Sequence, residues 1–248
     1  MEEPAERTDD AMYRGAVRIL QHRRGYRFSF DAVLLAHEVA RHQPAYGVEF
    51  CAGSAVVSLC LAAMLPPYRG EAYELQPPLA ALARENVARN GAAERIVVSE
   101  GDVRSIATAV QRPDIVFMNP PYFGAGEGTP SPNQERALAR HQVNGSLVEL
   151  LVAAKRVAAG GTVLFVYPGE REAAAVAALE RAGLGHISVR RVLPRDGAAA
   201  SFIILRGSEG GTTPTRILRP TLLHDEAGAI SDAHRAIVDG LLPAPSLD

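Results

Sequence analysis

The stretch that decides the fold is residues 46–75, YGVEFCAGSAVVSLCLAAMLPPYRGEAYEL. It contains a short apolar run at 48–51, a turn with Gly53, an apolar stretch of helical length at 56–64, and a second short strand pattern at 71–75. Short apolar runs that alternate with helical stretches indicate βαβ units and a parallel sheet. We therefore predict an α/β fold whose first strand, first helix and second strand are these three segments.

The same pattern predicts the remaining elements of the sheet. Helices are expected at 77–90, 147–158 and 170–182, and strands at 96–99, 114–118, 162–167, 187–193 and 201–205. Because residues 194–200 are too few for a helical crossover, the last two strands must pair antiparallel. We therefore predict seven strands, of which the leading five are parallel and the last is antiparallel. Residues 123–140 are rich in glycine and proline, which predicts a surface loop of the kind that forms lids or binding sites.

The charge changes sign along the N-terminal segment. The first ten residues carry five acids, whereas residues 11–30 carry five arginines and no acid. This asymmetry favours a local basic face. Short alternating stretches at 16–21 and 26–30 predict a basic hairpin after an acidic tail. A helix is expected next, with Ser29 or Asp31 as its N-cap.

Composition excludes several classes of protein. With 248 residues, 47% hydrophobic and 22% charged, the chain can bury a core as a single domain, an extension at 1–44 joined to a main part at 45–248. Two cysteines cannot build a disulfide framework or a structural zinc site. The sequence contains no run of about 18 apolar residues, so no membrane span is predicted. Because no signal peptide is visible, the cytoplasm is the expected location.

The basic residues are almost all arginines. The net charge is -2, and of the 26 basic residues Lys155 is the only lysine, so the other 25 are arginines. A GC-rich genome explains such an excess, and so does phosphate binding, for which arginine is the better residue. The position of individual arginines is therefore more informative than their number.

Asn119-Pro120-Pro121-Tyr122 follows the predicted buried strand at 114–118. Ligands of open α/β sheets bind at the carboxyl ends of the strands. The prolines fix their own φ and keep the preceding residue extended, so the Asn119 side chain and the Pro120 carbonyl can point at one spot. Both groups accept hydrogen bonds and suit a planar NH₂ group, while Tyr122 offers a face for a stacked base. A simple proline turn is the alternative, and the position at a strand end favours function.

This tetrapeptide resembles motif IV of the S-adenosylmethionine-dependent amino methyltransferases, which modify adenine, guanine or glutamine amide nitrogens. The family has an acid and a glycine-rich turn after its first strand, and further acids after the second and third strands. The resemblance implies a Rossmann-like class I methyltransferase fold that binds S-adenosyl-L-methionine and no metal. It assigns cofactor binding to Glu49, Gly53, Glu74, Asp102 and Asn119.

The glycine-rich turn departs from the family pattern. Cys51 and Ala55 stand where the family has flanking glycines, and only the central Gly53 is kept. A Cβ at Cys51 hinders a positive φ and close approach of a cofactor, whereas Ala55 adds one methyl group where the helix packs. Three interpretations remain open, namely ordinary binding, weakened binding, or a degenerate member without catalysis.

Within the wider group, the chain is most similar to the bacterial tRNA adenine methyltransferases, over residues 14–238. The similarity rests on residues 25–28, 31–36, 136–141 and 218–220 and on the long loop after Tyr122. That family modifies an adenosine beside the anticodon of a valine tRNA. The resemblance implies tRNA as partner, and substrate contacts from Pro121, Tyr122, Phe123, Arg136, Arg140, Arg24 and Arg27. These arginines, like Arg190, Arg191 and Arg195, could equally be solvated charges.

The reaction implied by the resemblance is an in-line methyl transfer to the 6-amino nitrogen of adenine. Asn119 and the Pro120 carbonyl would hold both N–H groups and stabilise the developing positive charge, so no strong base is required. Tyr122 would stack on the base once it leaves the RNA. We expect a monomer that does not associate with membranes. The alternatives are the same fold acting on a glutamine side chain or an rRNA base, or a non-catalytic RNA-binding protein.

Overall fold

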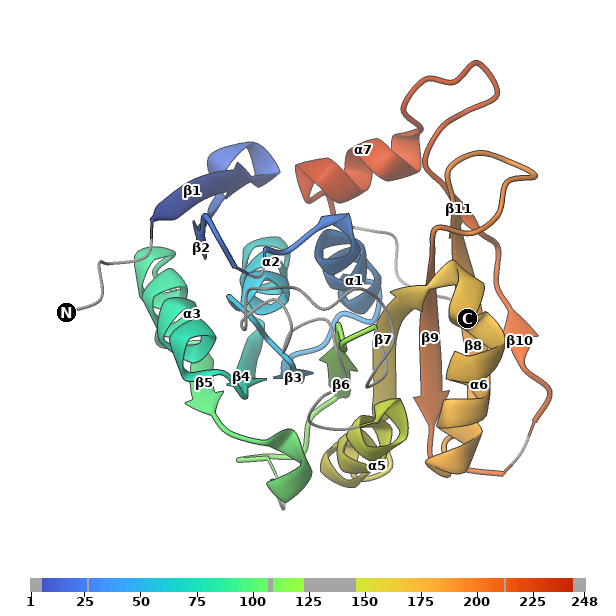
Figure 1. Ribbon diagram of the computed structural model, residues 1–248, viewed down its shortest axis with the longest axis horizontal. Helices are drawn as coiled ribbons and strands as arrows, with labels where there is room; N and C mark the ends of the chain where they lie inside the picture. The colour runs from blue at the N-terminus through green and yellow to red at the C-terminus, as the bar shows by residue number, and fades with distance from the viewer. Residues whose placement is uncertain (1–5, 26, 107–108, 123–145, 212, 243–248) are drawn as a thin grey trace.

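The computed structural model describes residues 6–25, 27–106, 109–122, 146–211 and 213–242, and one sheet crosses it with helices on both faces (Figure 1). The strands of the sheet are β3 (Tyr46–Phe50), β4 (Arg69–Glu74), β5 (Ile96–Glu100), β6 (Ile115–Met118), β7 (Thr162–Pro168), β8 (Gly185–Leu193), β9 (Phe202–Ser208), β10 (Arg216–Ile217) and β11 (Thr221–Leu222). The helices are α1 (Phe30–Ala40), α2 (Val56–Met64), α3 (Pro77–Arg89), α5 (Leu147–Ala158), α6 (Glu172–Arg181) and α7 (Asp232–Asp239).

The sheet has the order β10-β8-β9-β7-β6-β3-β4-β5. Strands β3 to β7 are parallel, and β9 runs antiparallel to both β7 and β8. The predicted α/β class, parallel leading strands and antiparallel hairpin are therefore confirmed. The predicted count of seven strands is too low for this sheet, because β10 and β11 add to its edge beside β8. Each has two residues, which is too short to produce an alternating pattern in the sequence.

The N-terminal hairpin differs from its prediction. Strand β1 (Arg7–Met12) pairs antiparallel with β2 (Val17–His22), so the predicted acidic tail is itself a strand and residues 27–29 form none. Opposite charges meet across this hairpin, with Arg18 on Asp9 at 2.9 Å. Arg23 and Arg27 likewise reach acids of the first ten residues, Glu6 at 3.2 Å and Asp10 at 2.9 Å. The expected basic face is thus largely an ion-paired surface.

The hairpin is docked on α3 through two asparagines. Asn86 and Asn90, one helical turn apart, each exchange hydrogen bonds with the backbone of β2, at Leu20 and at Arg18. These side chains occupy backbone groups that an uncovered strand edge would expose. Val17 and other β2 residues join the hydrophobic core beneath α1 and α2. The extension therefore shares its core with the rest of the chain, and a division at residue 44 stays a prediction.

Strand β6 lies in the middle of the core. Ile115 and Phe117 pack into the cluster formed with α1, α2 and α3, whereas Val116 and Met118 pack into the cluster formed with α5 and α6. All four side chains are buried, as alternation across a sheet covered on both faces requires. Asn119 therefore begins its loop from a rigid support.

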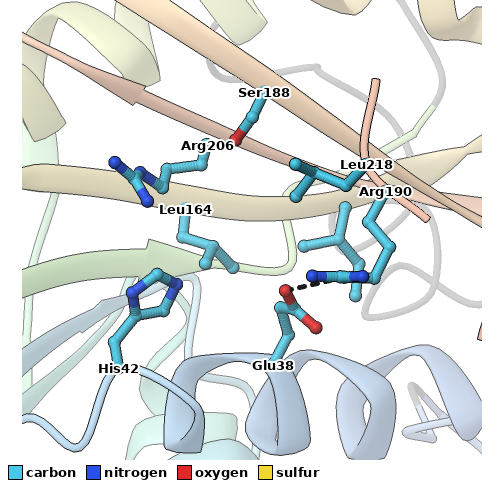
Figure 2. A pocket seen from close by; sticks show the side chains of 8 residues that line it. Glu38, His42, Leu164, Ser188, Arg190, Arg206 and Leu218 are labelled. Carbon is cyan, nitrogen blue, oxygen red and sulfur yellow. Dashed lines mark hydrogen bonds and ion pairs between the residues drawn. The ribbon is translucent and has the colours of Figure 1, made fainter. Parts of the chain in front are cut away.

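A buried ion pair joins α1 to strand β8 of the sheet. Glu38 on α1 accepts from Arg190 Nε on β8 at 3.0 Å, and both side chains are 9% exposed. Figure 2 shows the pair in a small pocket that His42 also lines. Arg190 also donates to the Arg219 carbonyl at 2.8 Å, while Arg191 pairs with Glu172 at 2.6 Å. Both arginines thus serve the fold.

Candidate active site

The loop after β6 holds its asparagine and tyrosine in one hydrogen-bonded cluster. Asn119 Nδ2 donates to Asp31 Oδ2 at 3.0 Å, and Asn119 Oδ1 accepts from the Tyr122 hydroxyl at 2.6 Å. The same hydroxyl also lies within hydrogen-bond distance of Asp31 Oδ2, so its one proton is shared between the two oxygens. Pro120 is buried, while Asn119, Pro121 and Tyr122 are partly exposed. The predicted catalytic residues therefore lie together at the carboxyl end of a parallel strand, where α/β proteins bind ligands.

Asp31 is a site residue that the sequence analysis missed. It is 5% exposed, and its Oδ1 accepts from the Ala32 N–H at 2.9 Å and from the Ser29 hydroxyl. In the sequence, Asp31 stands as a possible N-cap and as part of the family-like stretch 31–36, with no site role, and Ser29 is the N-cap. Its separation from Asn119 by 88 residues hides the contact. The available signal was a charged residue inside the apolar pattern of α1.

Tyr167 is a second such residue and holds the Tyr122 ring in place. It is the next-to-last residue of β7, the strand beside β6, and its ring meets Tyr122 edge-on with centroids 5.5 Å apart. Its hydroxyl donates to the Tyr122 carbonyl at 3.4 Å. The strand pattern at 162–167 predicts only that Tyr167 is a core residue. Nothing in the sequence connects it with Tyr122.

The loop after β3 is held in left-handed conformations. Cys51, Gly53 and Ala55 have φ values of 56°, 56° and 61°. Non-glycine residues adopt this region at a cost of roughly 1–2 kcal/mol each. The Gly53 N–H donates to Glu74 Oε2 at 2.8 Å, and the Gln76 N–H donates to Glu74 Oε1 at 2.9 Å. The loop thus keeps the glycine-type path although two of its three left-handed residues carry a Cβ.

The other two predicted cofactor residues have different surroundings. Glu49 is 2% exposed and accepts from the N–H of Ser58 at 3.0 Å and from its hydroxyl, so its carboxyl group faces α2. Burial raises the Glu49 pKa to about 8. Asp102 follows β5, and its hydrogen bonds from Arg104, at 2.9 and 3.0 Å from Nε, lower the pKa of Asp102. Cofactor contact by either residue stays a prediction.

The predicted RNA contacts divide into two groups. Phe123, Arg136 and Arg140 lie outside the described residues. Arg24 is exposed, and Arg27 donates to Thr8 at 2.6 Å and to Asp10 at 2.9 Å.

A cleft of about 530 Å³ opens between the hairpin, the start of α1 and α7. Among its lining residues are Arg27, Phe28, Ser29 and Phe30. Ser29 links this cleft to the cluster through its hydrogen bond to Asp31. An arginine and two aromatic rings therefore lie within four residues of the acid that holds Asn119.

Two features are absent from the described part of the chain. No described helix is long and apolar enough to cross a membrane. No group of three or more His, Cys, Asp or Glu side chains in that part could hold a metal ion.

Known proteins resemble this chain in sequence and in fold. A tRNA1(Val) (adenine(37)-N6)-methyltransferase from Porphyromonas gingivalis is 29% identical over 154 residues, which cover 58% of this chain and 60% of that protein, less than two thirds of its length. The protein of the same name from Aeromonas salmonicida is 30% identical over 165 residues, 66% of this chain and 67% of that protein. No family model matches the chain.

A solved structure gives the fold. It is described as a predicted O-methyltransferase from Agrobacterium tumefaciens, and it superposes with a TM-score of 0.67 at 22% identity, covering 88% of this chain and 100% of its own. The likeness confirms a Rossmann-like methyltransferase fold.

Proposed function

We propose that this chain, which belongs to the tRNA1(Val) (adenine(37)-N6)-methyltransferase family, transfers a methyl group from S-adenosyl-L-methionine to the exocyclic amine of adenine in RNA. We take tRNA near the anticodon as its substrate. The observation that carries the proposal is the Asn119 amide, whose nitrogen is held by Asp31 so that its oxygen faces the tyrosine side of the loop.

The residues around the first two strand ends fit the proposed cofactor. Glu74 anchors the Gly53 loop through backbone N–H groups, and a carboxylate at this strand end is the group type that accepts from the ribose hydroxyls of a bound nucleoside. Asp102 has a partly exposed carboxylate that would accept from the cofactor's adenine amine. Cys51 and Ala55 keep the left-handed path, so the backbone can still approach a ligand. When bound, the cofactor supplies an electrophilic methyl group on a sulfonium.

The chain's own residues would prepare the amine. Asn119 Oδ1 and the Pro120 carbonyl accept its two N–H groups and stabilise the positive charge that develops on nitrogen. The methylated nitrogen is then cationic and acidic and releases its extra proton to water, so no strong base is needed at the nitrogen. Tyr122, fixed at its hydroxyl and against Tyr167, offers a base-stacking surface, and alignment would provide much of the remaining acceleration.

The RNA footprint would surround this centre. Arg27 and Phe28 line the cleft beside Asp31, and the combination of arginine with aromatic rings suits a single-stranded loop. Pro121, Phe123, Arg24, Arg136 and Arg140 complete the proposed substrate contacts. With a net charge of -2, we expect local contacts with strong salt dependence. We further propose a cytoplasmic monomer, which light scattering after size exclusion would test.

Two measurements test the function. Calorimetric titration with S-adenosylmethionine measures whether the protein binds the cofactor despite the left-handed Cys51. If no binding is detected at millimolar cofactor, the enzymatic proposal fails and the alternative is a non-catalytic RNA-binding protein. Labelled cofactor is then incubated with total tRNA, ribosomal RNA or a release factor, and the product is digested. We expect N6-methyladenosine in tRNA only. Label in glutamine or in ribosomal RNA would assign the same chemistry to another substrate.

A further inference from the structure

The Asp31 carboxylate is saturated by donors from two parts of the chain. Its Oδ1 accepts from Ser29 and Ala32 at the start of α1. Its Oδ2 accepts from Asn119 and Tyr122 in the loop after β6. A carboxylate offers about four lone-pair sites, all of them acceptors, and here four donor groups face them, with the single Tyr122 proton shared between Asp31 Oδ2 and Asn119 Oδ1. Asp31 therefore joins the first turn of α1 to the proposed reaction centre, while being 5% exposed.

This arrangement decides which end of the Asn119 amide faces the substrate. A side-chain amide has an acceptor end and a donor end of nearly equal size, and only its partners distinguish the two orientations. Because a carboxylate cannot donate, it selects the NH₂ end, and the oxygen is left toward the Tyr122 hydroxyl and the loop after β6. An amide rotated by 180° would present its own NH₂ to the substrate's NH₂, and two donors cannot bond.

We propose that Asp31 is a positioning residue that sets the orientation of the Asn119 amide and the place of the Tyr122 hydroxyl before the substrate arrives. This inference rests on the proposed function for its kinetic consequence. Asp31 acts through Asn119, so its loss impairs the chemical step more than the binding of cofactor or RNA. A misplaced contact group can lower a rate about a hundredfold without changing the fold.

The kinetic test uses Asp31→Asn, which keeps the size of the side chain but replaces one acceptor oxygen by a donor. We expect kcat to fall about tenfold to a hundredfold. The cofactor Kd and the KM for RNA should stay within about threefold, since neither ligand touches Asp31 in this proposal. Asp232→Asn is the matched control, because Asp232 is also a first-turn aspartate behind a serine N-cap. It should leave kcat unchanged.

An exchange of the two groups separates orientation from stability. In the double variant Asp31→Asn/Asn119→Asp, the amide introduced at position 31 can donate to the new carboxylate, which presents an oxygen to the substrate in either orientation. We expect it to recover several-fold of the activity lost in Asp31→Asn. A kcat of Asp31→Asn within twofold of the wild type would overturn the proposal. So would a raised KM at unchanged kcat, or a double variant no better than the single one.

A readout without turnover keeps this inference apart from the proposed function. In protein with ¹⁵N-labelled asparagine, the Asn119 side-chain NH₂ signal is assigned by its loss in Asn119→Ala. We expect slow solvent exchange of this signal in the wild type and fast exchange in Asp31→Asn. Equal exchange rates would contradict the orienting role. If wild-type protein methylates no RNA, the proposed function fails, and the exchange measurement still decides the role of Asp31.

Discussion

Two loops at the ends of neighbouring strands keep their shapes in different ways. Residues 119–122 after β6 contain two prolines, which set the backbone locally, and one distant acid, Asp31, orients the side chains. Residues 51–55 after β3 contain one glycine but three left-handed positions. That second loop is held from outside, since Glu74 binds the Gly53 N–H and the Tyr73 carbonyl accepts from the Ala52 N–H at 3.0 Å.

The difference shows where each loop is vulnerable. The loop after β6 has a backbone that its own residues favour, so its function depends on a few side-chain hydrogen bonds. The loop after β3 holds Cys51 and Ala55 in a left-handed backbone conformation that such residues disfavour, so its shape depends on hydrogen bonds from other elements. Substitutions in the first should change catalysis at constant fold, whereas those in the second should change binding and stability together.

The largest effect is expected from the side chain that the proposed chemistry uses directly. Asn119→Ala should lower kcat about 10²–10³-fold, because the acceptor that stabilises charge on the amine is gone. Rapid-quench methylation assays measure kcat, and titration calorimetry should find the cofactor Kd within about threefold of the wild type. Asn90→Ala is the control, since it loses structural hydrogen bonds to β2 and should only lower the melting temperature. Unchanged methylation by Asn119→Ala would contradict the assignment.

The external support of the other loop gives the next effect. Glu74→Gln retains one acceptor but loses the charge that holds Gly53 and would bind a ribose, so the cofactor Kd should rise about tenfold or more. Titration calorimetry measures this change, with Glu100→Gln as a control at the end of the adjacent strand. An unchanged Kd would mean that the 51–55 loop does not hold the cofactor.

The same contrast explains what the sequence could predict. Some signals act locally, such as the two prolines of 119–122, Pro77 at the start of α3 and Gly91 just past its end. The position of the loop and the helix α3 were therefore both predicted correctly. Hairpin pairing, by contrast, is a choice between partners. Residues 7–12 pair with β2 in place of 26–30, because Asp9 meets Arg18 across the hairpin and α3 can cover the other edge of β2. Charge composition alone did not indicate that pairing.

The site shows the same division between local and distant information. The order of Gly53, Glu74 and Asp102 along the chain indicates a family arrangement, but Asp31 and Tyr167 reach the Tyr122 loop from other elements. Glu49 is predicted to bind the cofactor because it matches the acid of the family's first motif, and in the structure its carboxyl group accepts from Ser58 on α2. Side-chain direction at a strand end depends on packing that one sequence does not reveal.

Glu49 provides a pH test of the support beneath the 51–55 loop. Its pKa is raised from 4.5 to about 8 by burial, so the native state keeps a proton that the unfolded chain releases. The contribution of Glu49 to the free energy of unfolding should therefore be fully present below about pH 4.5 and should be lost as pH rises through 8. Glu49→Gln should flatten this slope and raise the melting temperature at pH 8 by roughly 2–6 °C. Thermal melts at pH 5 and pH 8 measure it, and an unchanged slope would contradict the cause given.

The smallest effect concerns the strain in the 51–55 loop. Cys51→Gly removes a Cβ from a residue at φ 56°, and the gain is partly offset by the greater entropy of glycine in the unfolded chain. The free energy of unfolding should rise by about 0.5–1 kcal/mol, and cofactor affinity should improve a few-fold as the backbone opens to the ligand. Denaturant unfolding and calorimetry measure the two quantities.

Ala52→Gly is the matched control for that change. Ala52 is the next residue and has no positive φ, so glycine there should lower the free energy of unfolding by about 0.5–1 kcal/mol. Opposite signs at adjacent positions would show that φ, rather than added flexibility, determines the outcome. Equal destabilisation by both variants would mean that packing of the Cys51 side chain outweighs the backbone strain. The loop would then be adapted to its cysteine, and the contrast with residues 119–122 would lose its physical basis.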